Sequence, residues 1–252
     1  MTDERKNNRK LLAFFIVFFV VIAFLAIYGA EHYNAHDESI ELETYCKVSD
    51  SALIKDNTST FVYYITWGGS PTGDAGSWAL YDFLHSNGFN MNGTFNETQS
   101  MSGYQYNNTP GLIFNTSYTY SVTYDHRNTI VVPVYLYGEN LNNNTTPAAG
   151  LKVLKADVPS SVYNVVKGYT TEAIVGGLSI SSDNMSSIPH INSVTLITGP
   201  SGAYLFNGYI VDPADYTNDT PGEVLHDVNN NTNDNGINTG MEGLEATIKD
   251  VR

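Results

Sequence analysis

Cysteine is almost missing from this chain of 252 residues, which holds a single one, Cys46. One thiol cannot form a disulfide within the chain, so the fold is not held by one. Nor can it supply the pair of thiols that disulfide exchange requires. An odd cysteine in an exported protein can pair with a second chain, although a free thiol of no consequence is the simpler interpretation.

Positive charge is also scarce. The chain has 12 Lys and Arg against 26 Asp and Glu, which gives a formal net charge of −14. An acidic exterior repels phosphate groups, so the composition argues against nucleic acid as a partner. Four of the basic residues stand together near the N-terminus, ahead of a long apolar run: Arg5, Lys6, Arg9 and Lys10.

The apolar run, Leu11–Tyr28, contains eighteen residues without a charge. A helix needs roughly 20 apolar residues to cross a bilayer core, so the run predicts one transmembrane helix. Basic residues precede it and acidic residues follow it, which predicts a single-pass protein of the cell membrane with a cytoplasmic N-terminus. A cleaved signal peptide is disfavoured, because Tyr28-Gly29-Ala30 has a bulky residue where a small one belongs. A pilin-type assembly helix is a lesser alternative without a clear cleavage motif.

The part that follows the apolar run is rich in candidate glycosylation sites, which suits an extracellular address. Asparagine-rich chains also produce sequons by chance, so we expect only a subset to be modified. The ten sequons begin at Asn57, Asn92, Asn96, Asn107, Asn115, Asn143, Asn144, Asn184, Asn218 and Asn230.

Composition divides the chain into five parts. Residues 1–10 are predicted to be cytoplasmic, 11–28 to span the membrane, and 29–58 to form a polar stalk. Residues 59–228 hold nearly all the regular patterns and are enough for one domain with its own core. Residues 229–252 form a polar tail that begins with NNNTNDNGINTG, and its last dozen residues could make a weak helix.

Within the domain the patterns alternate between strand and helix. Strand-like segments lie at 61–67, 111–124, 130–137, 194–198 and 203–206, the last two joined by the turn Gly199-Pro200-Ser201-Gly202. Helical patterns lie at 74–86, 159–167, 170–178 and from Pro221 onward, with Asp74 as the expected cap of the first. Pro133 suits an edge strand. This order predicts an α/β or α+β fold with helices covering a central sheet.

The junction between the first strand and helix carries a family resemblance. YYITWGGSPTGDAGSWALYDFL resembles an archaeal family of membrane-anchored proteins known as domain of unknown function 929. Its members have a strand, then Gly-Cys-Pro-Tyr-Cys-Ala-Ala, then a helix with Ser-Trp-Ala-Leu. Here Gly69, Pro71, Ala75 and Ser77–Leu80 stand in matching positions. Asn108–Phe114 and the hairpin at 198–208 resemble later segments, so the likeness covers roughly residues 60–215.

The resemblance implies a thioredoxin-like fold whose redox motif has been lost. Ser70 stands at the first cysteine of the family's Cys-x-x-Cys, and Gly73 stands at the second, with Pro71 and Thr72 between them. Neither residue can form an exchangeable sulfur bond, so thiol–disulfide chemistry is not expected here. A thioredoxin-like fold also implies a cis proline facing this turn. Pro189 is the candidate by position, and Pro110 is the second choice.

Other chemistries are less well supported. A phosphate-binding loop needs Lys then Ser/Thr after the last glycine, whereas Asp74 and Ala75 follow Gly73. A hydrolase with Ser70 as nucleophile would need a base, for which His190 is the nearest candidate. His32-x-x-x-His36 has the spacing of metal ligands but no fixed third one. The sequence therefore predicts no metal or other cofactor.

The leading hypothesis is a non-catalytic, membrane-tethered extracytoplasmic domain that binds an extended peptide or an unidentified protein. The expected binding residues surround the former redox turn: Trp67, Ser70, Thr72, Asp74, Ile188 and Pro189. Such a face can pair with a peptide backbone even without cysteines. The alternatives are a structural surface glycoprotein of the cell envelope and a residual oxidoreductase or hydrolase.

Overall fold

The computed structural model describes residues 39–102, 105–142, 144–232 and 235–252. Residues 40–252 cluster into one unit. The predicted cytoplasmic segment, the apolar run Leu11–Tyr28 and the first part of the predicted stalk lie outside the described residues. Within the described ranges, no helix combines the length and the apolar character needed to cross a membrane.

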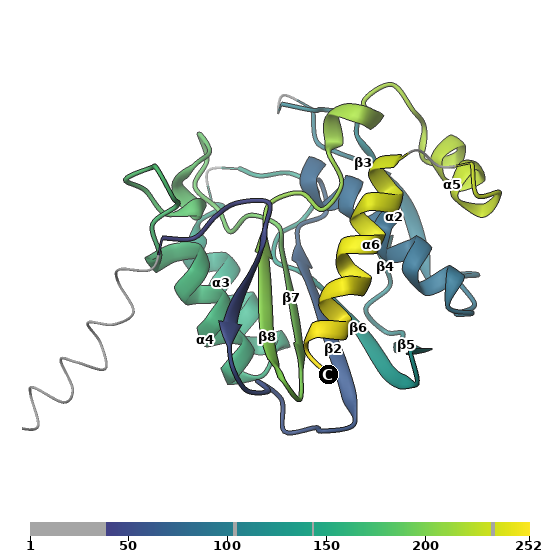
Figure 1. Ribbon diagram of the computed structural model, residues 1–252. Coiled ribbons are helices and arrows are strands. Elements are labelled where there is room, and N and C mark those ends of the chain that lie inside the picture. Colours follow the sequence, from purple (N-terminus) through teal and green to yellow (C-terminus); the bar gives the residue numbers. More distant parts are fainter. Residues whose placement is uncertain (1–38, 103–104, 143, 233–234) are drawn as a thin grey trace, which may run out of the picture. The chain divides into compact units, whose positions relative to one another are not determined.

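A six-stranded mixed sheet in the order β1-β8-β7-β2-β6-β5 forms the centre of this unit (Figure 1). Its central pair, β2 (Ser59–Thr66) and β6 (Arg127–Tyr135), runs parallel. β5 (Tyr120–Tyr124) pairs with β6 only over residues 127–131, so one side of Pro133 has no partner strand. The proline, predicted for an edge strand, is thereby tolerated inside the sheet.

The other half of the sheet is antiparallel. β7 (Val194–Gly199) pairs with the free side of β2 and forms a tight hairpin with β8 (Gly202–Asn207). β1 (Tyr45–Ser49) pairs with β8 and is an edge of the sheet. The end of β2 and the start of β7 therefore meet at the same end of the sheet.

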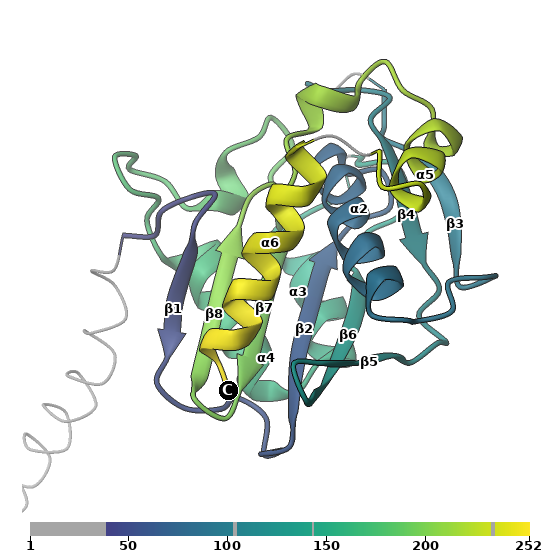
Figure 2. The same cartoon turned by 45° about the vertical axis from the view of Figure 1, so that its right-hand side comes forward.

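Helices cover both faces of the sheet (Figure 2). α2 (Pro71–Ser86) and α6 (Asn235–Asp250) lie on one face, and α3 (Pro147–Asp157) and α4 (Ser160–Lys167) lie on the other. Neighbouring residues of β2 alternate between the two cores, because successive side chains of a strand point to opposite faces. Val62 and Tyr64 pack on the α2 side, whereas Tyr63 and Ile65 pack on the α3–α4 side.

A small second sheet leans on α2. It consists of β3 (Phe95–Gln99) and β4 (Pro110–Phe114), and α5 (Pro221–Asn229) packs against both strands. Trp78 Nε1 of α2 donates to the Pro110 carbonyl at 2.9 Å, and the Leu112 N–H donates to Ser77 Oγ at 2.8 Å. The segment around Asn108–Phe114 is thus packed directly on α2, the helix that begins after Ser70.

Several predicted elements are confirmed. The hairpin, the first strand, the helix after Pro159 and the helix beginning at Pro221 all form close to their expected bounds. The single strand-like stretch 111–124 is instead two strands in different sheets, β4 and β5. The helix predicted at 170–178 was wrong, because α4 runs on only through a π-helical turn, Gly168–Glu172, and Gly177 then has a positive φ of 77°.

The predicted boundaries of the domain were too narrow. The region assigned to the stalk contributes Ile40, which is buried, and the edge strand β1. The polar tail forms the long helix α6, which buries Ile237, Leu244 and Ile248 against the sheet. Every residue of β1 is half-buried or exposed, so it lacked the alternation that marks a strand. Glycine and asparagine diluted the apolar face of α6.

Gly111 sets how closely β4 approaches α2. A Cβ atom there would overlap Cα and Cβ of Asp74 and lie 2.8 Å from the Asp74 carbonyl oxygen. We predict that Gly111→Ala lowers the free energy of unfolding by about 1–3 kcal/mol, the usual cost of overpacking. Urea unfolding monitored by circular dichroism measures this change.

Gly222→Ala is the matched control for this prediction. A Cβ at Gly222, in α5, meets nothing within 4 Å. The substitution should leave stability unchanged or raise it by up to ~1 kcal/mol, since alanine is the better helix former. A G111A variant as stable as the unmodified chain would contradict the close packing of β4 on α2.

Candidate functional site

The junction between β2 and α2 is a capped helix N-terminus. Ser70 is the N-cap residue, and its Oγ accepts a hydrogen bond from the Gly73 N–H at 3.0 Å. Pro71 occupies the first helical position, where no N–H is needed. The predicted cap, Asp74, therefore lies inside the first turn, because the helix begins three residues earlier than the pattern suggested.

Ser193, the residue before β7, faces this junction. Its Oγ lies 3.0 Å from Ser70 Oγ and 2.7 Å from Thr66 Oγ1. All three side chains are buried. They form a chain of hydroxyl groups that joins the end of β2, the start of β7 and the first turn of α2.

Position 73, where the resemblance implies a second cysteine, has no space for a side chain. Gly73 has no side chain, and a Cβ placed there would overlap Thr66 Oγ1 and lie 3.0 Å from Thr66 Cβ. The hydroxyl of Tyr64, in β2, donates to the Gly73 carbonyl. Thr66 therefore occupies the space that a cysteine at position 73 would need.

The predicted cis proline is not present. Every peptide bond in the described residues is trans, including those before Pro189 and Pro110. Pro189 is exposed and Ile188 is half-buried, and neither lines the cavity beside Ser70. Pro189 lies five residues before β7, too far from the strand to face the junction, and Ser193 lies there instead.

His190 approaches the junction but does not pair with Ser70. Its ring stands edge-on to Trp67, with the ring centroids 5.6 Å apart. Nδ1 lies 2.7 Å from the Ile188 carbonyl oxygen and 3.0 Å from Ser186 Oγ. Ser70 Oγ is engaged with Ser193 and Gly73, so the two side chains share no hydrogen bond among the described contacts. A Ser–His catalytic pair is not assembled.

Burial also shapes the charge state of this histidine. It lowers the pKa of His190, while the Ile188 carbonyl and Asp183 act in the opposite direction. A neutral imidazole that donates from Nδ1 to the Ile188 carbonyl leaves its Nε2 as an acceptor. His190 thus lines the site with an aromatic ring whose charged form is disfavoured by burial.

These residues enclose a cavity of about 310 Å³ at the N-terminal end of α2. Ligand cavities in proteins range from about 300 to 1,000 Å³, so it could hold a small group or one segment of a peptide. Its lining includes Trp67, Ser70, Thr72, His190, Asn192, Ser193 and Asn207. Leu42, Glu43, Tyr106, Met185, Tyr209 and Pro213 also line it.

The cavity wall offers unused hydrogen-bonding groups. Asn207 is buried, and its Nδ2 donates to Ser182 Oγ at 2.9 Å while its Oδ1 has no partner. Asn192 is half-buried, and its side chain donates to the Ser182 carbonyl at 2.6 Å. Within the described residues, no hydrogen bond involves the backbone N–H or carbonyl of Asn192. Among the described residues, one donor and one acceptor, both on the backbone of Asn192, are thus unpaired at the cavity, whereas the unpaired Asn207 Oδ1 is buried out of reach.

Three of the six predicted binding residues, Trp67, Ser70 and Thr72, line the cavity. Asp74, Ile188 and Pro189 do not. The prediction missed Asn192, Ser193 and Asn207, which reach the site only through the pairing of β2 with β7 and of β7 with β8. The available signal was their position, since Asn192 and Ser193 directly precede a strand and Asn207 ends one.

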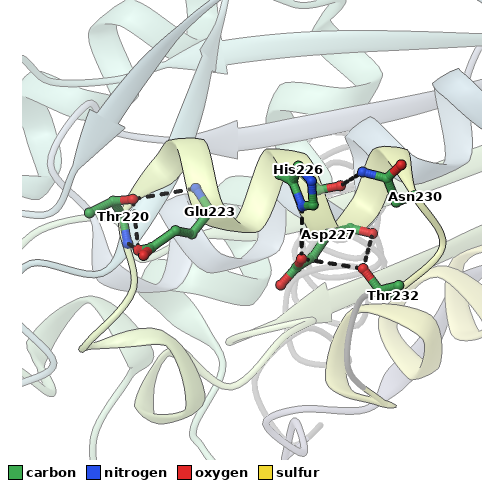
Figure 3. A network of polar contacts seen from close by, with 6 residues as sticks. All are labelled: Thr220, Glu223, His226, Asp227, Asn230 and Thr232. Carbon is green, nitrogen blue, oxygen red and sulfur yellow. Dashed lines mark hydrogen bonds and ion pairs between the residues drawn. The ribbon is translucent and has the colours of Figure 1, made fainter.

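A second cavity of about 150 Å³ lies beside α5 and is lined by Asp219, Glu223, Asp227 and Thr232 among others. Glu223, Asp227 and Thr232 have hydrogen-bond partners on or beside α5 (Figure 3). Thr220 and Glu223 form a capping box at the start of α5, and Asp227 Oδ1 contacts His226 Nδ1 and Thr232 Oγ1, both at 3.2 Å.

In the part of the chain that the structure describes, no group of three or more His, Cys, Asp or Glu is placed to hold a metal ion. His32 and His36, which have the spacing of metal ligands, lie outside that part.

Asp74 is a buried acid beneath the site. It is 3% exposed, it packs against Gly111, and its Oδ2 has no hydrogen-bond partner. Burial raises the pKa of the Asp74 carboxyl well above its ordinary value. In the unfolded chain the same carboxyl ionises near pH 4, so the folded state holds the proton to higher pH.

We predict that Asp74→Asn stabilises the protein at neutral pH but not in acid. Below about pH 4 the carboxyl is protonated in both states and its burial has no ionisation cost. As the pH rises toward the folded-state pKa, ionisation of the unfolded state lowers the stability of the unmodified chain, and the amide removes this loss. Urea unfolding at pH 3, 5 and 7 measures the difference.

The exposed Asp50 provides the control. Lys47 donates to its carboxylate and lowers the Asp50 pKa, so Asp50→Asn should have a small effect of the opposite sign, present at pH 7 and lost in acid. A D74N variant that is no more stable than the parent at pH 7 would show that burial of the Asp74 carboxyl does not lower the stability of the folded state at that pH.

The comparisons with known proteins agree with the extent of this fold. The family model described as "Domain of unknown function (DUF929)" matches residues 44–250, from the start of β1 to the end of α6. No curated protein and no solved structure matches the chain. The family match covers most of the chain and includes both the predicted stalk end and the predicted tail. The chain therefore belongs to the DUF929 family, whose function is unknown.

Proposed function

We propose that this protein is a membrane-tethered, extracytoplasmic domain of thioredoxin-like fold that binds an extended peptide segment without thiol chemistry. The observation that carries the proposal is the cavity of about 310 Å³ at the N-terminus of α2, with an open backbone edge at Asn192. Leu11–Tyr28 would be the membrane anchor, which places the domain outside the cell.

The topology supports the thioredoxin-like assignment. The chain runs β2-α2-β6, then α3 and α4, then the hairpin β7-β8, then α6. The four central strands stand in the order β6-β2-β7-β8, with β2 and β6 parallel and the hairpin antiparallel. β1, β5 and the β3–β4 sheet are additions around this centre.

The chemistry of the cavity suits a peptide backbone. An extended peptide carries alternating N–H and carbonyl groups, and it can pair with an open N–H and carbonyl on one residue, as strand addition does. Asn192 supplies both groups. Trp67 and His190 line the cavity, so a peptide side chain held there would lie beside aromatic rings.

A peptide-display experiment tests this proposal. The full chain, held in lipid nanodiscs, is screened against random 12-residue peptides, and binders with dissociation constants below 1 mM are expected. Thr72→Trp should weaken them at least tenfold, about 1.4 kcal/mol, because the indole fills the cavity mouth. Thr123→Trp, at an exposed site on β5 away from the cavity, is the control. Peptides that bind both variants equally, or no binders at all, would refute the cavity as the site.

A surface glycoprotein is the second candidate, and one observation favours it. The nine sequon asparagines within the described residues are all exposed, and Asn143 lies outside them. The less exposed asparagines, such as Asn192 and Asn207, are not in sequons. Exposure of this kind permits glycosylation of the folded domain, and it is compatible with a peptide-binding role.

The lost redox site offers a test of the fold. We predict that Ser70→Cys with Gly73→Cys destabilises the protein and forms no reversible disulfide, because Thr66 fills the space of the second side chain. Adding Thr66→Ala removes the obstructing Oγ1 and Cγ2 and should allow the disulfide to form. Mass shift on thiol alkylation, before and after reduction, measures it.

The single substitution Thr66→Ala in the unmodified chain controls for its effect on stability. An alkylation-resistant, dithiothreitol-sensitive pair in the triple variant would support the thioredoxin-like assignment. A folded triple variant whose two thiols never pair would count against it.

A further inference from the structure

The chain enters the described domain at Ile40, which is fixed to one loop. Its N–H donates to the Ile174 carbonyl at 3.0 Å, and its carbonyl accepts from the Gly176 N–H at 2.8 Å. Ile40 is 3% exposed and packs with Ala173 and Val175. The loop between α4 and β7 thus lies beside the segment that leads into β1 (Figures 1 and 2).

This loop presents aliphatic side chains to the outside. Ile174, Leu178 and Ile180 are 44%, 45% and 42% exposed, and they are three of the five large hydrophobic residues exposed in the described part. Backbone hydrogen bonds hold them in a compact turn, from the Leu178 N–H to the Val175 carbonyl and from the Val175 N–H to the Ile180 carbonyl. Single exposed apolar residues are ordinary, whereas this turn holds three of the five in the described part, which makes it a candidate contact surface.

The loop is also free of charge. Residues 173–182, AIVGGLSISS, hold no ionisable side chain, in a protein whose net charge is −14. The flanking acids are engaged, since Glu172 pairs with Lys167 and the buried Asp183 accepts from Ser181 and Asn184. A surface of this composition can leave water at little electrostatic cost.

We propose that the turn 174–180 rests on the lipid bilayer and orients the domain on it. The inference rests on the anchor of the proposed function and not on the peptide cavity. Residues 29–39 alone join Tyr28 to Ile40, and eleven residues span at most about 40 Å. The apolar turn is hydrogen-bonded to Ile40, the residue at which that tether ends. A short tether raises the effective concentration to the millimolar range, so that a weak apolar contact suffices.

Membrane contact would also define the surroundings of the cavity. Leu42, which follows Ile40 by two residues, is one of the residues that line it. One lining residue of the cavity thus lies two residues from the point at which the tether ends. Its occupant would be a membrane-proximal peptide segment.

Lipid-borne quenching tests the contact. The full chain with Cys46→Ser carries a single fluorescent label at Leu178→Cys, or at Tyr118→Cys as the matched control. Tyr118 is 46% exposed and lies just before β5, at the opposite edge of the sheet. In phosphatidylcholine vesicles with nitroxide-labelled headgroups, we expect at least twofold quenching at position 178 and none at 118. Ile174→Ser with Ile180→Ser should reduce the quenching at 178.

Each outcome has a separate meaning. Flotation with the vesicles shows whether the chain is anchored in them, whatever the quenching at position 178. A chain that does not float with the vesicles would overturn both the anchor and this inference. A chain that floats but shows equal quenching at the two positions, or none at 178, would overturn the contact and leave the proposed function standing. Cross-linking of position 178 between two copies, without quenching, would assign the turn to a second copy and overturn the lipid contact.

Discussion

Helix α2 is enclosed by protein along most of its length, and this enclosure constrains everything near the candidate site. Every residue from Gly73 to Leu84 is buried. The sheet, β4 and α6 all contact it, so their distances depend on small residues at the points of contact. Gly73 lies against Thr66, Gly76 lies against Tyr64, and Gly111 of β4 lies against Asp74. The same tight packing leaves no space for a side chain at position 73.

The junction places polar side chains at a helix N-terminus, and none of them is a thiol. A helix N-terminus lowers the pKa of a thiol placed there, because the free N–H groups stabilise the thiolate. Ser70 accepts the Gly73 N–H with a neutral hydroxyl instead, and it shares a hydrogen-bonded chain with Ser193 and Thr66. The donors that would stabilise a charged sulfur thus serve as an ordinary cap, and what remains usable is the cavity and the open backbone at Asn192.

Sequence reasoning found the parts of this fold that have local signals. The turn Gly199–Gly202 and the pair Thr220-Pro221 predicted the hairpin and α5 directly. The same cap-then-proline signal begins α2 at Ser70-Pro71 and α3 at Thr146-Pro147, but it was overlooked at both. β1 and β3 carry no such signal. Their residues are half-buried or exposed without alternation, so only pairing with a neighbouring strand makes them strands. In the site, Trp67, Ser70 and Thr72 were predictable from the junction, whereas Ser193 and Asn207 arrive through strand pairing.

The way in which the chain enters the domain has a mechanical consequence. A pull on the N-terminal segment is delivered at Ile40, which two backbone hydrogen bonds and a three-residue apolar cluster hold to the loop at 173–176. Behind this clasp lies β1, a five-residue edge strand with an irregular register against β8. Tension would therefore open the clasp first and peel β1 next, while the four central strands and α2 stay intact. Under such tension the domain would unfold from its edge, one short element at a time.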